Sequence, residues 1–501
     1  MSIGWMIFIL AAIGWHIGLY GMFKKAGIEG WKAFIPFYNT WCMVEKMALK
    51  KYWFFLQLIP IAGQFITIWI CIKFVEHFGR FGFWHHFAAV FFPFFYFPYL
   101  GFSKSERYAG TAVVKNYKKS TAREWIDAAA FAIVAATLIR TFVFEAYTIP
   151  TPSEEKTLLV NDFLFVSKST YGPRIPNTPI AMPFVHHTIP GLNVKSYVEW
   201  IQIPYTRWFA SPVTRNDAVV FNFPVNDTLI NDEVNFGSRV TYYDEVRRVG
   251  RERVWQDHGD IIITRPVDKR ENFIKRCVGI AGDNLQIING KLHVNGKPED
   301  FFPHSERYYR LQVPDGQFID KETLHEFGIN VREEQGDLLQ EKANVFIVNI
   351  TNEEKLKNSL PKDYILTDYI REHENSLFPY YSDTTGKNWS ADNYGPVWVP
   401  KKNVALSLTP DNVIRYQRCI EVYEGNKFED RDGKYFINGT EATSYTFKMD
   451  YYFMMGDNRH NSLDSRYWGF VPEDHVVGKA SLIWFSWENG PRWKRLFRWI
   501  K

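Results

Sequence analysis

Hydrophobic residues are distributed unevenly along this chain of 501 residues. The first 145 residues are dense in Phe, Trp, Ile and Leu, whereas charged residues are spread through the remainder. Four apolar runs in the first part are each near the length of roughly 20 residues that a helix needs to cross the hydrocarbon layer of a membrane. The pattern predicts four spanning helices, over residues 4–22, 53–72, 82–101 and 126–144.

The third of these segments is the least regular. Pro93 and Pro98 interrupt it, and His85 and His86 stand near its start. A proline inside a helix removes a backbone hydrogen bond and disfavours helical backbone at the residue before it. Two interpretations stay open for this segment: a full span, or a re-entrant segment at the membrane interface.

Basic residues in the short loops predict the orientation of the helices. The loops after the first helix and before the fourth are rich in Lys and Arg, whereas the loop between the second and third has only Lys73 and Arg80. Loops rich in Lys and Arg stay in the cytoplasm. We therefore expect the N-terminus and everything after about residue 145 to lie on the external face. If the third segment did not span, that second part would lie in the cytoplasm.

The chain after residue 148 has a different pattern. Short runs of Val, Ile and Phe alternate with turn residues and predict strands over residues 157–167, 217–223, 260–264, 273–280 and 285–294. The last run contains Asn289-Gly290, a strong signal for a two-residue hairpin turn. The sequence thus predicts an α-helical transmembrane region followed by a mainly antiparallel β domain.

Two stretches of the β region have the composition of insertions. Residues 168–214 are rich in Pro and aromatic residues with few charges, so they either dip into the bilayer interface or pack on the core as a loop. Residues 295–450 are polar and charged, and we expect them to form a second, smaller β-rich domain. The C-terminal tail mixes bases with aromatics in a way that suits anionic lipid headgroups, at Trp493, Lys494, Arg495, Phe497, Arg498, Trp499 and Lys501.

Charge and cysteine content narrow the functional classes. A net charge of +4 is nearly neutral for this length and gives no reason to expect a nucleic-acid partner. Cys42, Cys71, Cys277 and Cys419 are not spaced as metal ligands. We expect them to be free thiols, mostly buried, in preference to a Cys277–Cys419 disulfide. No metal or cofactor is expected.

Two motifs carry candidate chemistry in the first half of the β region. The motif IPTPSEEK at 149–156 places Ser153 on a turn directly after the last predicted helix, although an isolated serine of this kind is usually only a turn residue. The motif FIKRCVGIAGD at 273–283 places Lys275 on the same strand face as Phe273 and Cys277. An apolar face favours a neutral amine, which can take a proton from a serine hydroxyl. The alternative is a solvated Lys-Arg pair on an edge strand.

A third motif, MMGDNRHNSLDSRYWGFVP at 454–472, is dense in small polar residues, as is typical of a loop held by internal hydrogen bonds. Within it Asp464 and Arg466 can form an ion pair, and Ser462 can supply a hydroxyl that orients an amine. The 13 histidines of the chain form no triad motif, which argues against a Ser-His-Asp site.

In this order, the three motifs resemble the conserved boxes of bacterial type I signal peptidases, the Ser/Lys proteases of the leader peptidase family. Residues 217–224 (DAVVFNFP) resemble another box, and the likeness covers about residues 148–166, 217–224, 260–283 and 454–480. Residues 30–39 (GWKAFIPFYN) resemble, less closely, an accessory membrane module found beside such peptidases in some bacteria.

The resemblance implies a role for each matching residue. Ser153 matches the nucleophile and Lys275 the general base. Ser462 matches the serine that positions the lysine, and Thr151 joins the Ser153 N–H in the oxyanion hole. The other matches are the bracing pair Asp464 and Arg466, and the substrate-pocket positions Ile149, Phe273 and Ile274.

The implied activity is removal of N-terminal signal peptides from exported proteins by a membrane-bound serine endopeptidase. Its expected partners are signal peptides, the lipid bilayer and the secretion machinery. Its expected location is the bacterial inner membrane, which it crosses several times, with the catalytic domain on the periplasmic face. The expected organisation is a membrane module (1–125), a last transmembrane helix (126–145), a catalytic β domain (146–294 and 451–485), an inserted domain (295–450) and a tail (486–501).

The chain departs from the family pattern at a few positions. The family usually has Gly or Ser at Pro152, Met at Glu154, Gly at Asn161 and Pro at Ala281. Pro152 removes an N–H beside the nucleophile, and Glu154 can bring a carboxylate close to the lysine, which favours the ammonium form. One alternative is therefore a weak or silent relative that binds signal peptides or scaffolds the export machinery. The others are a self-cleaving Ser/Lys protease and a membrane transporter or sensor.

Overall fold

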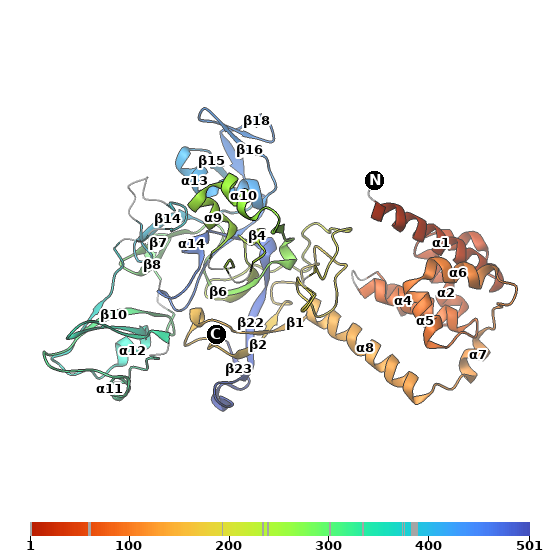
Figure 1. The fold of residues 1–501 in the computed structure, drawn as a ribbon, viewed down its shortest axis with the longest axis horizontal. Helices are drawn as coiled ribbons and strands as arrows, with labels where there is room; N and C mark the ends of the chain where they lie inside the picture. Colours follow the sequence, from red (N-terminus) through yellow and green to blue (C-terminus); the bar gives the residue numbers. More distant parts are fainter. Residues whose placement is uncertain are drawn as a thin grey trace. The chain divides into compact units, whose positions relative to one another are not determined.

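The computed structural model describes all residues except 1–2, 59–61, 193, 233–234, 238–239, 300–301, 333–334, 373, 375, 382–388 and 501, and leaves out the side chains of 3–9, 62 and 64. Lys501, part of the predicted basic tail, thus lies outside the described residues. The chain divides into two compact units, shown in Figure 1. One comprises Met1–Arg140 and Thr178–Ile203, and the other comprises Thr141–Asn177 and Pro204–Lys501.

The first unit is helical, as the apolar pattern predicts. Its elements are α1 (Ile3–Lys25), the 3₁₀ turn η1 (Gly30–Phe34), α2 (Tyr38–Lys46), α3 (Tyr52–Leu56), α4 (Ala62–Glu76), α5 (Phe83–Phe91), α6 (Pro93–Phe102), α7 (Thr111–Asn116) and α8 (Thr121–Phe142), whose last two residues belong to the second unit. The helices bury a common apolar core that includes Phe23, Phe74 and Leu100. α1 and α6 are in close contact at Gly18, where an added Cβ would lie 2.5 Å from Phe97. Small residues of this kind let helix backbones approach each other.

Two of the four predicted spanning helices are not continuous. The prediction of one helix over 53–72 is wrong, because α3 ends at Leu56 and α4 begins at Ala62. The prediction of one helix over 82–101 is also wrong, because α5 ends at Phe91 and α6 begins at Pro93. Phe92 lies between them with φ −132° and ψ 40°, outside the helical region, since helical backbone is disfavoured before a proline.

The first and fourth predicted helices correspond to single helices, α1 and α8. Among the described residues, α8 is the one helix that is both long and apolar enough to cross a membrane. Its apolar stretch has no buried residue. The other predicted spans therefore lack this support.

The second unit is built on an eight-stranded sheet, as the predicted β region requires. Its strands are β1 (Phe144–Thr148), β2 (Asp162–Ser167), β22 (Val476–Ser486), β3 (Ala218–Asn222), β6 (Asn272–Gly279), β20 (Tyr451–Met455) and β21 (Val471–Pro472), in that spatial order, with β23 (Arg498–Trp499) paired to β22. All neighbouring strands run antiparallel. The long strand β22 comes from the end of the chain, so the sheet joins segments that are far apart in sequence.

The sheet is covered by apolar residues on both faces. Val219 and Phe221 of β3 belong to one buried cluster, and Ala218 and Val220 belong to another. Successive side chains of a strand point to opposite faces, so this division places one cluster on each side. All of β3 is buried, and so are the last five residues of β6, so this part of the sheet is interior.

The remaining strands form smaller sheets. β7 (Asn284–Ile288), β8 (Lys291–Val294), β9 (Lys297–Pro298) and β14 (Tyr394–Trp398) form one sheet of four, and β10 (Glu306–Gln312), β11 (Leu338–Lys342), β12 (Val345–Thr351) and β13 (Ile365–Asp368) form another. Short sheets pair β4 (Thr228–Ile230) with β5 (Ile262–Thr264), β15 (Ala405–Ser407) with β19 (Ser444–Thr446), and β16 (Phe428–Arg431) with β17 (Lys434–Ile437) and β18 (Thr440–Glu441). The helices of this unit are α9 (Tyr242–Val249), α10 (Arg251–His258), α11 (Lys321–Glu326), α12 (Asn352–Lys357), α13 (Pro410–Arg418), continued by a π turn (Cys419–Tyr423), and α14 (Ser465–Trp468). Short 3₁₀ turns lie at Pro152–Glu154, Val267–Lys269, Glu473–His475 and Trp493–Arg495.

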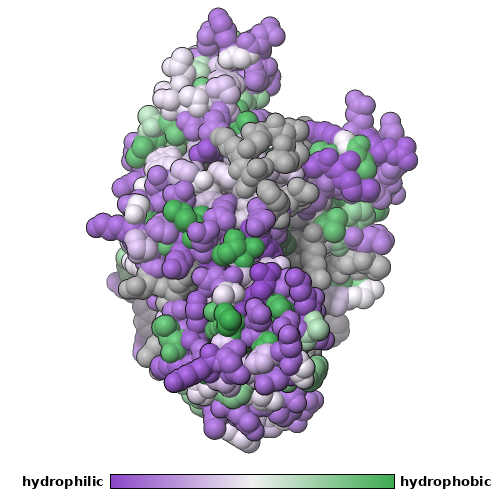
Figure 2. Space-filling view, turned by 90° about the vertical axis from the view of Figure 1, so that its left-hand side faces the viewer, coloured by the Kyte–Doolittle hydropathy of each residue, from purple (hydrophilic) through white to green (hydrophobic). Residues whose placement is uncertain are grey.

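The segment 295–450 contributes to several of these sheets. Strands β10–β13 have a core of their own, which includes Leu311, Val348 and Ile350, and we call them the inserted sheet. β14, in contrast, pairs with β7, which precedes the segment. The face of the molecule in Figure 2 is largely hydrophilic, with apolar residues in small groups, as expected where each sheet buries its own core.

The short-range β predictions agree well with the structure. β7 and β8 form the expected hairpin, and both turn residues have positive φ, 49° at Asn289 and 73° at Gly290. The predicted strand at 157–167 begins later, at Asp162. All four cysteines are free and buried, which confirms the preferred interpretation over the disulfide.

Candidate active site

The first motif forms the connection between β1 and β2. Ile149 continues the strand pairing, since its N–H donates to the Asp162 carbonyl at 3.0 Å and its carbonyl accepts from Asn161 at 2.9 Å. The chain between them leaves the sheet, and residues Pro152–Glu154 make one 3₁₀ turn. The hairpin thus presents Ser153 on a short turn whose two ends are held in the sheet.

The second motif brings Lys275 to this turn. Lys275 lies within β6 opposite Val219 of β3, and it is only 4% exposed. Its Nζ lies 2.6 Å from Oγ of Ser153 and 2.8 Å from the carbonyl oxygen of Ile274. The predicted nucleophile and base are therefore in hydrogen-bonding contact, and the lysine is not a solvated residue of an edge strand.

Glu154 lies beside this pair, as we expected from its place next to Ser153, where the family usually has Met. Its side chain is 1% exposed, and its Oε1 lies 3.7 Å from Nζ of Lys275. Neither carboxyl oxygen has a hydrogen-bond partner among the described residues. Burial, together with the nearby Asp457 carboxylate, raises the pKa of Glu154 to about 8, although Lys275 and neighbouring arginines act in the opposite direction. Glu154 is therefore largely protonated near neutral pH.

A buried ion pair supports the strand that carries the lysine. Arg276 points away from Lys275, and its guanidinium binds Asp457 through two hydrogen bonds of 2.6 Å. Neither side chain is exposed. Burial opposes ionisation of Asp457, but Arg276 and the Thr157 hydroxyl hold the pKa of this carboxyl below its ordinary value. The alternation of faces indicated that Arg276 has a different environment from Lys275, but it did not identify Asp457 as the partner.

The third motif forms a loop closed by the predicted pair. Asp464 and Arg466 are buried, with oxygen–nitrogen distances of 2.8 and 2.9 Å. Burial alone would raise the pKa of Asp464, but Arg466 and backbone N–H groups keep it below its ordinary value. Asp464 also accepts the Gly456 N–H at 3.1 Å, so this pair fixes the loop beside the serine.

The other predicted site residues differ in their contacts. Thr151 is exposed, and its Oγ1 lies 3.5 Å from Oγ of Ser153. Ser462 is buried, but its Oγ has no hydrogen-bond partner among the described residues, so its lysine-orienting role stays a prediction. Lys275 instead has the Ile274 carbonyl as its second contact.

The three predicted pocket residues are divided between the two faces of the sheet. Ile149 and Ile274 belong to one apolar cluster. Phe273 belongs to the other, where its ring stacks on Phe223 with centroids 4.2 Å apart. Ile149 and Ile274 are therefore neighbours in the fold, whereas Phe273 packs in the opposite layer.

Sequence reasoning did not identify Asn458 as part of the site. Its backbone N–H donates to the Ser153 carbonyl at 3.1 Å, and its side-chain amide donates to the Pro152 carbonyl at 3.3 Å. Asn458 thus binds the peptide groups on both sides of the Ser153 Cα. Its place in the third motif was the available signal. No group of three or more His, Cys, Asp or Glu side chains that could hold a metal is found in the described part of the chain.

The chain matches two family models. Residues 122–338 and 394–487, more than half of the chain, match the model of the signal peptidase family, peptidase S26. Residues 31–111 match a family of unknown function, DUF5684. The second match includes most of the 30–39 segment for which an accessory module was expected.

Similar proteins with the name signal peptidase I occur in several bacteria. The protein of Buchnera aphidicola subsp. Schizaphis graminum is 24% identical over 366 residues, which cover 72% of this chain and 76% of the relative. That of Haemophilus influenzae is 25% identical over 401 residues, covering 76% and 77%. That of Rickettsia canadensis is 23% identical over 380 residues, covering 75% and 85%. The chain therefore belongs to the signal peptidase family, peptidase S26, and is a type I signal peptidase, a serine protease.

Proposed function

We propose that this enzyme is anchored in a membrane and removes N-terminal signal peptides from exported proteins with Ser153 as nucleophile and Lys275 as general base. The observation that carries the proposal is the 2.6 Å contact between two side chains 122 positions apart in sequence. Lys275 is also shielded from water, and the neutral form of a lysine amine is the form that can accept the serine proton.

The reaction follows from this contact. The neutral amine of Lys275 takes the hydroxyl proton of Ser153 as Oγ attacks the scissile carbonyl carbon. The resulting ammonium then gives that proton to the leaving amine as the peptide C–N bond breaks, which leaves an ester on Ser153. Lys275, neutral again, takes a proton from a water molecule as that water attacks the ester carbonyl carbon. The ammonium then returns this proton to Oγ of Ser153 as the ester bond breaks, which releases the signal peptide and restores the dyad.

The negative oxygen formed in each step needs hydrogen-bond donors. We assign this role to the backbone N–H of Ser153 and the hydroxyl of Thr151, which lies near the nucleophile. One such donor contributes a factor of about 10² to 10³ in rate. In this proposal Ser462 lines the lysine site, and Asp464 and Arg466 brace the loop.

The substrate would bind as an extended segment with small side chains, in an Ala-x-Ala pattern, against an edge of the sheet. Ile149 and Ile274 are apolar neighbours that suit a shallow pocket, and Phe273 was predicted to line it as well. Signal peptides are therefore the proposed substrates, and no cofactor enters the mechanism.

We further propose an inner-membrane location with the catalytic domain on the periplasmic face. The support is α8, which is apolar, unburied and followed directly by β1 and the serine turn. In this proposal residues 1–125 form a membrane module, 126–145 the last span, 146–294 with 451–485 the catalytic domain, and 295–450 the insertion. The bilayer and the secretion machinery are proposed partners.

Exposed aromatic residues suggest where the enzyme contacts lipid. In the 168–214 stretch Phe184 and Trp200 are exposed, and in the 486–501 tail Trp493 and Trp499 are exposed. Aromatic side chains favour the membrane–water interface, and nearby bases favour anionic headgroups. Arg495 is an exception, because it is buried and binds Asp162.

Cleavage of a purified pre-protein with an Ala-x-Ala site tests the dyad. The full-length enzyme in detergent micelles should cleave it, and Ser153→Ala and Lys275→Ala should not, while both variants keep the wild-type melting temperature. Lys269→Ala is a matched control, since Lys269 is also a buried lysine but is not part of the dyad. Normal cleavage by Lys275→Ala would refute the proposal.

Covalent labelling distinguishes an active enzyme from a catalytically silent relative. A serine-directed acylating inhibitor should label the wild-type enzyme at Ser153 and should label Lys275→Ala much more slowly. An enzyme that binds signal peptides without being labelled would instead be a scaffold.

A further inference from the structure

Residues 152–156, which we call the nucleophile turn, are bound to the 295–450 segment through Lys156. Lys156 is the last residue of this turn, and its Nζ donates to the carbonyl of Asn330. The same Nζ lies 3.4 Å from Glu354 and 3.5 Å from Glu306. All three contacts lie in the 295–450 segment, so Lys156 ties the turn to the insertion.

Glu306 depends on this contact. Its side chain is fully buried, and its two carboxyl oxygens have no hydrogen-bond partner among the described residues. Burial raises the pKa of Glu306 well above its ordinary value, and Lys156 is the strongest opposing influence. A buried polar group without a polar neighbour is costly, so the 3.5 Å contact with Lys156 stabilises this carboxyl. Lys156 and Glu306 therefore hold each other in place.

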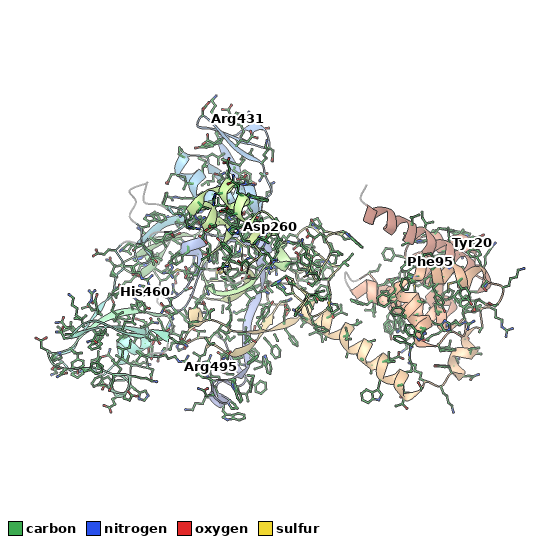
Figure 3. All side chains as sticks on the ribbon, in the orientation of Figure 1. Tyr20, Phe95, Asp260, Arg431, His460 and Arg495 are labelled. Carbon is green, nitrogen blue, oxygen red and sulfur yellow. The ribbon has the colours of Figure 1, made fainter. Side chains whose placement is uncertain are left out.

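Glu306, the first residue of β10, also pairs with the third motif through its backbone. Its backbone N–H donates to the Asp457 carbonyl at 2.7 Å, and its carbonyl accepts the Arg459 N–H at 2.8 Å. This makes a parallel bridge between Glu306 and Asn458. His460, labelled in Figure 3, continues the contact, since it accepts the Tyr308 N–H of β10 at 2.9 Å.

The inserted sheet has a second connection to the nucleophile, which passes through Asn458. The side chain of Asn349, in β12, is buried and donates to Oδ1 of Asn458 at 3.1 Å. Asn458 in turn donates to the carbonyls of Pro152 and Ser153. The peptide groups that carry the serine are thus held from the inserted sheet by a buried chain of hydrogen bonds.

The turn needs such support. Lys156 has φ 65°, in the left-handed region that residues other than glycine rarely adopt. Conformations of this kind cost on the order of 1–3 kcal/mol and persist only where surrounding contacts hold them.

One of the three partners of Lys156 lies outside the region that matches the family. The family match is interrupted between residues 338 and 394, and the gap contains β12, β13 and Glu354, whereas Glu306 and Asn330 lie inside the match. The contacts of Lys156 are thus built partly from residues that the family match does not cover.

We propose that the inserted sheet positions the nucleophile, with Lys156 and Glu306 as the positioning residues that keep Oγ of Ser153 within reach of Lys275. The inference rests on the proposed Ser/Lys dyad. Neither positioning residue touches the reacting atoms, so the effect is on orientation. A displacement of about 1 Å at a reacting group can cost about 100-fold in rate.

The test compares kcat and KM for a pre-protein substrate in three variants of the full-length enzyme. Lys156→Met should lower kcat about 10- to 100-fold with KM within about twofold, because substrate contacts stay intact. Lys156→Arg, which keeps the charge, should recover most of the loss. Lys355→Met is the matched control: Lys355 lies in α12 and pairs with Asp368 at 2.7 Å, whereas Lys156 contacts Glu306 and Glu354, and loss of Lys355 should leave kcat unchanged.

Melting temperatures separate positioning from simple stability. A lower melting temperature of Lys156→Met with wild-type kcat would overturn the inference, as would a kcat no better in Lys156→Arg than in Lys156→Met. Should Lys156→Met fail to fold, Glu306→Gln supplies the same comparison, because it keeps the side-chain size and replaces the carboxyl that contacts Lys156; an unchanged kcat there would overturn the inference too. Failure of the dyad itself would appear separately, as cleavage by Lys275→Ala.

Discussion

Replacing Glu154 by Met tests the electrostatics of the site most directly. The substitution removes a buried acid whose oxygens have no hydrogen-bond partner among the described residues and substitutes an apolar side chain of similar length. Burial raises the pKa of Glu154 from 4.5 to about 8 in the folded protein. Between these values the unfolded chain has released the proton and the folded chain retains it, so the folding free energy becomes less favourable as pH rises.

The size of this change in folding free energy follows from the pH, because each pH unit between the two pKa values costs about 1.36 kcal/mol. Below pH 4.5 both states are protonated and Glu154 has no such cost. The cost is about 1 kcal/mol at pH 5 and about 4 kcal/mol at pH 7.5, and it stays constant well above the folded pKa of about 8. Glu154→Met should therefore be more stable than the wild type at pH 7.5, with a gain about 3 kcal/mol smaller at pH 5.

Thermal unfolding of both proteins at pH 5 and pH 7.5 measures this difference. The shift in melting temperature between variant and wild type should be clearly larger at pH 7.5. Packing changes caused by Met act equally at both pH values, so the change with pH isolates the acid. An equal shift at the two pH values would refute the assignment of Glu154 as a buried acid.

The same variant has an expected effect on catalysis. The Glu154 carboxyl lies 3.7 Å from the amine of Lys275, at a position where the sequence comparison expected Met. Activity of Glu154→Met at pH 7 should therefore be preserved or increased. A large loss of activity at every pH would mean that Glu154 has a direct role in the reaction.

Three further outcomes are expected. Asp457→Asn breaks the buried pair with Arg276 and should cost about 3–5 kcal/mol, measured as a loss of folding free energy in urea, and a loss below about 1 kcal/mol would contradict the pairing. Thr151→Val should lower kcat about 100- to 1000-fold without a change in melting temperature, and unchanged kcat would remove Thr151 from the oxyanion hole. Replacing Trp493, Phe497 and Trp499 by Ala should weaken contact between the tail of the full-length enzyme and anionic vesicles. Brominated lipid in the vesicles should then quench less tryptophan fluorescence than it does in the wild type. Equal quenching of the remaining tryptophans would argue against lipid contact of the tail.

Local patterns predicted the elements whose structure depends on neighbours in sequence. The Asn289-Gly290 turn forms as expected because its two residues tolerate positive φ. The strand at 273–280 was predicted almost to the residue, because alternation of faces marks a strand directly. The helices over 53–72 and 82–101 were misjudged, since apolar composition measures suitability for a membrane and not continuity of the backbone.

The sequence by itself determined the chemical groups: a serine on a turn, a lysine on an apolar strand face, and a loop with Asp464 and Arg466. Only the tertiary structure decided that Ser153 meets Lys275, because their contact depends on strands β2, β22, β3 and β6 lying side by side. It likewise decided that Glu154 is buried beside the amine and that Lys156 reaches Glu306. Burial and long-range contact depend on how the whole sheet is assembled, and no local pattern of residues contains that information.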